Sequence, residues 1–194
     1  MSIWDSIEQQ ISASIGRTFQ LQNHAAVLGG DINQAKRIEG IAEGQALSFF
    51  IKINQKNRLS MFEAEAAGLQ EIQASQTIQV PRVICSGVVK NQSYLILENL
   101  ALGHASADSA SLLGQQLALM HKTTHQQFGW RCENTIGTTQ QVNTLTASWP
   151  EFWRQYRLGF QLELAKRNGA HRSLHIKGEQ LLAQLDHFFV DYTP

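Results

Sequence analysis

The sequence of 194 residues predicts an α+β fold of two lobes, in which an antiparallel sheet with one inserted helix precedes a helical part. Short apolar runs separated by Gly-Gly, Gly and Glu-Gly turns fill residues 20–54, a pattern typical of an antiparallel meander. Beyond residue 103 the apolar residues recur at helical spacing instead. We therefore expect a sheet lobe over residues 1–100 and a partial helical lobe over residues 101–194.

The first lobe is expected to begin with a helix. Isoleucines recur every four residues from Ile3 to Ile15 and so fall on one helical face, which ends near Gly16. Three strands of the meander follow, and the clearest of them is the apolar run over residues 46–53.

A second helix and a second hairpin complete the first lobe. Ser60 and Glu63 match a capping box, so a helix is expected to start there and to last until about Ser75. Pro81 opens a strand, and an Asn-Gln turn leads into the apolar strand 94–97. The lobe should therefore hold a five-stranded antiparallel sheet.

The second lobe is predicted to be helical around one long polar segment. Apolar residues share a face over residues 109–125, and two more helices are expected over residues 152–164 and 181–189. Residues 128–148 are predicted to form a polar loop, and loops of that length in a compact domain are usually functional.

Composition excludes several classes of partner. Lys and Arg number 16, as do Asp and Glu, so no net charge attracts nucleic acid or an anionic membrane. The first ten residues lack the features of a signal peptide, and no apolar run approaches the ~18 residues of a membrane span. Cys85 and Cys132 do not form a disulfide framework. We expect a cytoplasmic protein.

The first candidate constellation is the run from Gly29 and Gly30 to Asn33, between two predicted strands. Glycines in a hairpin let successive backbone N–H groups approach phosphate oxygens. A plain hairpin turn is the alternative, and the run is not a Walker loop, because no Gly-Lys-Ser/Thr follows it.

The second constellation is a lysine and a glutamate. Lys52 alternates with Phe50 in a strand, so both are expected to face inward, where a charge needs a partner. Glu65 falls on the apolar stripe of the following helix and is the obvious partner. The alternatives are an edge-strand lysine in water and a partly exposed glutamate.

Together these features follow the order of protein-kinase-like folds. In those folds a glycine loop covers the ATP phosphates, and a strand lysine contacts them while a helix glutamate positions the lysine. The connector between the lobes would then hold adenine. Its candidate residues are Glu98, Asn99 and Leu100, with the backbone of Glu98 and Leu100 supplying an acceptor and a donor.

More specific stretches, spread over about residues 26–165, resemble the fructosamine/ketosamine 3-kinases, relatives of the aminoglycoside and choline kinases. The run Asn-Thr-Ile-Gly, followed by Gln-x-Asn and Trp-x-x-Phe, is more specific than a general kinase signature. The stretches that carry the resemblance are Gly29–Asn33, Phe50–Asn54, Met61–Glu65, Gly68-Leu69, Val80–Val83, Leu119–His121, Phe128–Trp130, Glu133–Gly137, Gln141–Asn143, Trp149–Phe152 and Arg157–Gly159.

The resemblance implies an ATP-dependent kinase that uses Mg²⁺ and phosphorylates the 3-hydroxyl of fructosamine, ribulosamine or a related ketosamine, free or on a glycated protein lysine. It implies that Gly29, Gly30 and Asn33 form the phosphate loop and that Lys52 and Glu65 form the ion pair. It also implies that the polar loop 134–143 helps to wall the sugar-amine site.

The sequence departs from the family at two places. Asp31 stands where some members carry a redox-sensitive cysteine, so no such switch is expected. The family's His-Gly-Asp-Leu-Trp-Ser-Gly-Asn motif, with its catalytic base and metal ligand, is not found. We expect the catalytic Asp to lie beyond Pro194 and this chain to be an inactive first part, with no metal ligands of its own and an uncovered helical face that could self-associate.

Two alternatives remain open. A non-catalytic nucleotide-binding or interaction module would also explain the missing motif. An aminoglycoside- or choline-type phosphotransferase would fit the order of elements, although not the Asn-Thr-Ile-Gly run.

Overall fold

The computed structural model of the chain describes residues 2–28, 32–190 and 192. It divides into two compact units, Met1–Thr123 and Thr124–Pro194, which are described separately below. The predicted α+β class is confirmed, since strands and helices make up the first unit and helices with one short hairpin make up the second. The functional lobes expected over residues 1–100 and 101–194 stay a prediction.

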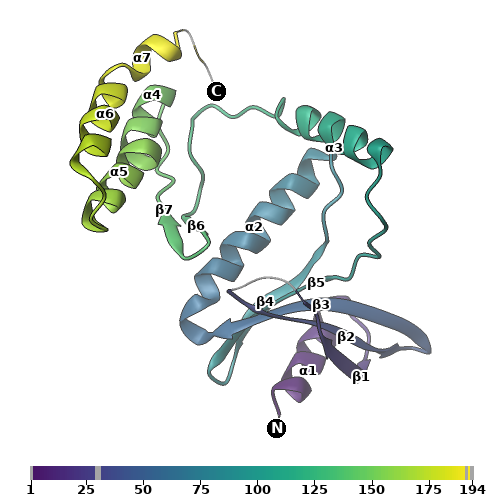
Figure 1. Ribbon diagram of the computed structural model, residues 1–194. Coiled ribbons are helices and arrows are strands. Elements are labelled where there is room, and N and C mark those ends of the chain that lie inside the picture. Colours follow the sequence, from purple (N-terminus) through teal and green to yellow (C-terminus); the bar gives the residue numbers. More distant parts are fainter. Residues whose placement is uncertain (1, 29–31, 191, 193–194) are drawn as a thin grey trace. The chain divides into compact units, whose positions relative to one another are not determined.

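The first unit is built on a five-stranded antiparallel sheet, as predicted. Its strands lie in the order β1-β2-β3-β5-β4, so the first hairpins form a meander and the last hairpin adds its second strand beside β3 (Figure 1). The strands are β1 (Phe19–Ala26), β2 (Gln34–Ala42), β3 (Gln45–Gln55), β4 (Val83–Val89) and β5 (Gln92–Glu98).

A helix covers each face of this sheet (Figure 1). On one face Ile7 and Ile11 of α1 (Ile3–Ile15) are fully buried against a core that includes Ile51. On the other face Phe62 of α2 (Leu59–Ser75) packs with Leu97. Because strand side chains alternate between faces, β3 sends its odd-numbered residues 49–53 to α1 and its even-numbered ones to α2.

The capping box expected at Ser60 is wrong. A 3-10 turn, Lys56–Arg58, joins β3 directly to α2, so the helix begins at Leu59 and Ser60 already lies in its first turn. The backbone N–H of Lys56 donates to the carbonyl of Asn91 over 3.1 Å and fixes this turn. The predicted end at Ser75 is confirmed.

Gly40 on β2 marks the tightest approach within the sheet. A Cβ atom at this position would collide with the carbonyl oxygen of Gln20 and with the ring of Phe19 on β1. The β1–β2 register shifts between Leu21 and Asn23, next to this contact. The buried Phe19 ring therefore occupies the space that a side chain at residue 40 would need.

After β5 the chain runs into α3 (Ala107–Met120), which belongs to the first unit. Ser106 caps its first turn through the N–H of Ser109, and His121 ends it earlier than the residue 125 that the sequence predicted. The predicted apolar face of α3 is present but uncovered, and Leu112 and Leu113 each expose more than half of their surface.

The second unit starts with the segment that was predicted to be a polar loop. A two-stranded hairpin of β6 (Asn134–Ile136) and β7 (Thr139–Gln141) lies within it. The chain then forms α4 (Trp149–Phe152), a π-helical turn (Trp153–Arg157) and α5 (Leu158–Arg167) as one continuous helical run. The helix expected over residues 181–189 is divided at Gln184 into α6 (Arg172–Ala183) and α7 (Leu185–Phe188).

Candidate functional site

Lys52 and Glu65 form the ion pair that the sequence predicted. The Nζ of Lys52 lies 2.5 Å from Oε1 of Glu65, and each side chain keeps somewhat more than a quarter of its surface exposed. Lys52 shares the face of β3 that α2 covers, and Glu65 lies on the side of α2 that faces the sheet. The pair is therefore held by two rigid elements while remaining accessible to a ligand.

A cavity of about 490 Å³ opens beside this pair within the first unit. Most of its wall is apolar, and its charged groups are two cations and two carboxylates. Five of the eight residues predicted to bind a nucleotide line it: Lys52, Glu65, Glu98, Asn99 and Leu100. The other lining residues are Val27, Arg37, Phe50, Leu69, Pro81, Leu97 and Leu102.

Three predicted residues are not among those lining residues. Gly29 and Gly30 lie outside the described residues, as does Asp31. Asn33 is described, and its Oδ1 accepts a 2.7 Å hydrogen bond from Nδ2 of Asn54 on β3. The same amide nitrogen donates to the carbonyl of Ile32, so Asn33 lies where the β1–β2 connection is tied to β3.

The connector after β5 is held by bonds to its neighbours. The N–H of Glu98 donates to the carbonyl of Arg82 over 2.8 Å, and the N–H of Arg82 donates back to the Glu98 carboxylate over 3.1 Å. The Nδ2 of Asn99 donates to Oγ of Ser48 over 3.1 Å. The backbone N–H of Glu98 is therefore used within the fold, so of its two backbone groups the carbonyl is the one left for a ligand.

Strand register arranges the cavity face of the sheet in rows. One row consists of Arg37, Phe50 and Leu97 on β2, β3 and β5, because Phe50 pairs with both of the others. The adjacent row has Lys52 at its centre, between Ala35 and Leu95. Neighbouring strands lie about 4.8 Å apart, so the first row extends from the connector to Arg37 over two strand spacings.

Sequence reasoning missed Arg37, although a signal for it was present. The Glu-Gly turn at residues 43 and 44 sets the register of the β2–β3 hairpin, and counting back from it pairs residue 37 with residue 50. The Nε of Arg37 lies 3.1 Å from Oε1 of Glu39, and half of the arginine side chain is exposed.

The polar segment expected to wall a sugar site is strongly bonded within itself. Asn143 is buried, and its Nδ2 donates to the carbonyl of Cys132 and to Oδ1 of Asn134, both over 2.9 Å. Arg157 donates to Oδ1 of Asn143 over 2.5 Å and to the carbonyl of Val142 over 2.9 Å. Burial lowers the pKa of Arg157 below its usual value. These side chains shape the segment, and its role in substrate binding stays a prediction.

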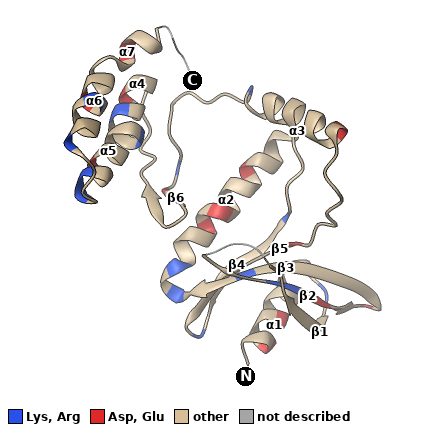
Figure 2. Ribbon diagram, in the orientation of Figure 1, with Lys and Arg blue, Asp and Glu red and all other residues tan. Residues whose placement is uncertain are grey.

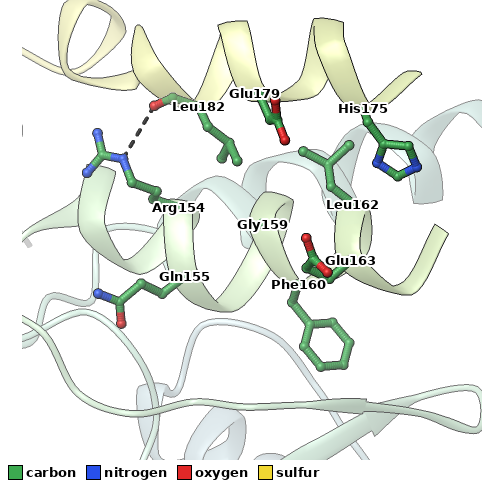
Figure 3. Close-up of a pocket in the computed structure, with 9 residues that line it drawn as sticks. All are labelled: Arg154, Gln155, Gly159, Phe160, Leu162, Glu163, His175, Glu179 and Leu182. Atoms are coloured by element: carbon green, nitrogen blue, oxygen red, sulfur yellow. Dashed lines mark hydrogen bonds between the residues drawn. The ribbon is translucent and has the colours of Figure 1, made fainter. Parts of the chain in front are cut away.

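A second cavity, of about 410 Å³, lies between α5 and α6 (Figure 3). The guanidinium of Arg154 is engaged there by the carbonyl of Leu182 and by Asp186, at 3.3 and 2.8 Å. Glu163 and Glu179 contribute carboxylates to the lining. No residue proposed from the sequence as a binding group lies in this cavity.

The described residues include no group of three or more His, Cys, Asp or Glu side chains placed to hold a metal ion. Within the same part of the chain no helix combines the length and the apolar character that crossing a membrane requires. Lys, Arg, Asp and Glu occur on the elements of both units (Figure 2).

Comparison with known proteins places the chain in a family. The model of the family described as fructosamine kinase matches residues 3–194. A Synechocystis protein named as a probable ketoamine kinase is 44% identical over 169 residues, which cover 87% of this chain and 56% of that protein. A protein-ribulosamine 3-kinase of Arabidopsis thaliana chloroplasts is 36% identical over 177 residues, 90% of this chain and 53% of that protein. The chain thus spans about half the length of these relatives.

Two crystal structures have the same fold. One, from Haemophilus somnus 129PT and named as a candidate fructosamine-3-kinase, matches 98% of this chain and 63% of its own, with a TM-score of 0.82 and 25% identity. The other, from Thermobifida fusca and named in the same way, matches 98% and 64% with a TM-score of 0.78 and 26% identity. The resemblance found in the sequence is confirmed, and the chain belongs to the fructosamine kinase family.

Proposed function

We propose that this protein is an ATP-dependent kinase of ketosamines and that its first unit binds the nucleotide. The observation that carries the proposal is the cavity in which the Lys52–Glu65 pair and the connector after β5 meet. The names of the Synechocystis and Arabidopsis relatives, a ketoamine kinase and a ribulosamine 3-kinase, support the substrate class.

In this proposal the phosphates of ATP bind at one end of the cavity and the adenine binds at the other. Lys52 binds the α- and β-phosphates, and Glu65 holds the ammonium in position, as in other kinase-like sites. At the opposite end the carbonyl of Glu98 accepts from the amino group of adenine, and the N–H of Leu100 donates to a ring nitrogen. Asn99 holds the connector against β3 through its bond to Ser48.

The phosphate loop would be completed by Gly29, Gly30 and Asn33. Support comes from Asn33, which joins the β1–β2 connection to the same strand that carries Lys52. A loop anchored on that strand would bring its backbone N–H groups toward phosphates bound by Lys52.

The proposed reaction phosphorylates the 3-hydroxyl of a fructosamine, ribulosamine or erythrulosamine, free or on a glycated protein lysine. The hydroxyl oxygen attacks the γ-phosphorus, the bond to the leaving ADP oxygen breaks, and the hydroxyl proton passes to a base. We assign neither that base nor a metal to this chain. Mg²⁺ is proposed as the ion that accompanies ATP, because kinases use it in this role, and no step is derived from it.

Two further proposals concern the setting of the protein. Cys85 and Cys132 are free thiols, which supports a location in the cytoplasm.

The exposed apolar residues of α6 and α7, Leu174, Ile176 and Phe188 among them, support self-association of this chain through its helical unit. Sedimentation at several concentrations would test the second proposal, and a single monomeric species throughout would reject it.

The nucleotide proposal is tested by calorimetric titration of the chain with Mg-ATP, using Lys52→Met and the exposed control Lys122→Met. We expect ATP to bind the parent chain and the control alike and to bind Lys52→Met at least tenfold more weakly. Equal binding to all three would place ATP elsewhere. The substrate is tested separately, by following conversion of a ribulosamine or fructosamine to its 3-phosphate with ³¹P NMR on the protein with its complete reading frame.

A further inference from the structure

We propose that Arg37 recognises the nucleobase by stacking its guanidinium plane on the base and that Glu39 holds the guanidinium in this orientation. The inference rests on the proposed function, because it requires the nucleotide to occupy the cavity beside Lys52. It assigns a base-binding role to a charged side chain in a wall that is otherwise largely apolar.

The first argument is the place of Arg37 along the strands. It lies in the row of Phe50 and Leu97, and Leu97 leads directly into the connector that is proposed to bind the edge of the base. A base held at Glu98 would lie over this row. Arg37 forms the far end of the row, within reach of the face of the base or of the base–ribose junction.

The second argument is the direction in which the guanidinium is held. Lys52, at the proposed phosphate end, pairs with Ala35, whereas Glu39 pairs with Ser48 on the opposite side of the Arg37 row. The contact between Nε of Arg37 and Glu39 therefore draws the guanidinium away from Lys52 and toward the row in which Asn99 of the connector bonds Ser48. The Glu39 carboxylate also accepts a 3.3 Å hydrogen bond from Nδ2 of Asn23 on β1, which fixes it on the side of the Arg37 row away from Lys52. This position is remote from the proposed phosphate end of the cavity.

The third argument is chemical. A guanidinium is planar and weakly hydrated, and it stacks on aromatic faces, whereas a lysine ammonium is a compact point charge. Half of the Arg37 side chain is exposed and the residue lines the cavity, so surface is available to a ligand. A carboxylate bound at Nε fixes the plane of the group without covering its face, which is the arrangement that stacking needs.

Calorimetric titration with adenosine, ATP and inorganic tripolyphosphate separates base contacts from phosphate contacts. We expect Arg37→Ala to weaken adenosine and ATP by the same factor, about 2- to 30-fold, the range expected of a cation–π contact, and to leave tripolyphosphate unchanged. Arg37→Lys should behave more like Arg37→Ala than like the parent, because it restores the charge but not the plane. Glu39→Gln should give a smaller loss with the same ligand pattern.

Arg17→Ala serves as the matched control, because Arg17 bonds Gln45 and does not line the cavity. Its binding of all three ligands should equal that of the parent, and the melting temperatures of the unliganded variants should agree with it. A loss confined to ATP and tripolyphosphate would overturn the inference and make Arg37 a phosphate ligand. Unchanged binding by Arg37→Ala, with Lys52→Met still defective, would overturn it while leaving the proposed function intact. If the parent bound none of the ligands, both would fail.

Discussion

The Nζ of Lys52 on β3 lies 2.5 Å from Oε1 of Glu65 on α2, yet both side chains remain partly exposed to solvent. An ion pair of this kind contributes little to stability, because water screens both charges and competes for them. The consequence of the pair is orientation. The Glu65 carboxylate holds the Lys52 ammonium at the edge of the cavity, whereas an unpaired lysine side chain would adopt many positions there.

Glu65→Gln should separate orientation from stability. We expect ATP affinity to fall about 5- to 30-fold, since Lys52 keeps its charge but loses its charged partner, while the free energy of unfolding changes by less than about 1 kcal/mol. Titration calorimetry and urea denaturation measure the two quantities. Glu63→Gln is the control, because Glu63 is exposed on the same helix. Equal losses of affinity in both variants would argue against a specific role for Glu65.

The bond between Asn99 and Ser48 predicts a coupling between connector and sheet. Asn99→Ala and Ser48→Ala should each weaken ATP binding about 2- to 5-fold, because either change frees the connector beside the proposed adenine site. Their effects on unfolding free energy should be coupled by about 0.5–1.5 kcal/mol in a double-mutant cycle. Additive effects would mean that the bond does not hold the connector in solution.

Asn143→Ala should strongly destabilise the second unit. The buried amide joins Cys132, Asn134 and Arg157, and its removal leaves several polar groups without a partner. The expected loss is about 2–4 kcal/mol in urea unfolding. Three of the four tryptophans belong to the second unit, so their fluorescence reports on it. Asn168→Ala, at an exposed helix end, is the control, and a loss below about 1 kcal/mol for Asn143→Ala would contradict the network.

The buried Tyr94 should make the folded protein less stable at high pH. Burial raises its pKa to about 12, with a smaller contribution from Cys85. The unfolded chain releases this proton near pH 10 and the folded chain only near pH 12, so the folded state binds more protons in between and its stability falls as pH rises from 10 to 12. The full effect is on the order of 2 kcal/mol.

Tyr94→Phe should remove this part of the pH dependence, measured as urea unfolding between pH 9 and 11.5. Burial also raises the pKa of Cys85, which adds a loss of the same sign that begins near pH 9. The proteins with Tyr94 and with Phe at this position should therefore be compared in a Cys85→Ser background. Tyr192→Phe, which changes an exposed tyrosine, is the control. An unchanged slope in Tyr94→Phe would refute the assignment.

The parts of the site that sequence could predict are those set by periodicity. A period of two places Lys52 and Phe50 on one face of β3, and a period of 3.6 turns Glu65 toward the same face. Both assignments need only local sequence and the order of elements. The ion pair was therefore predictable before any contact was known.

What sequence could not predict depends on contacts between distant segments. The capping box at Ser60 failed because a bond from Lys56 to Asn91, 35 residues later, starts the helix earlier. The use of the Glu98 N–H by Arg82 likewise depends on how the start of β4 meets the end of β5. The hairpin at residues 134–141 is short and polar, so it lacks the alternation that identifies a strand.

Gly40 lies outside the residues that line the cavity beside Lys52, yet it should be among the least replaceable positions of the chain. Any side chain there must displace either the backbone at Gln20 or the buried ring of Phe19, and Phe19 is part of the core beneath the sheet. In a mutational scan that measures activity, variants at Gly40 should therefore score as inactive, although they remove no group that contacts a ligand. Measuring cellular protein abundance together with growth would distinguish them, because Gly40 variants should lack the protein itself, whereas Lys52 variants should accumulate normally.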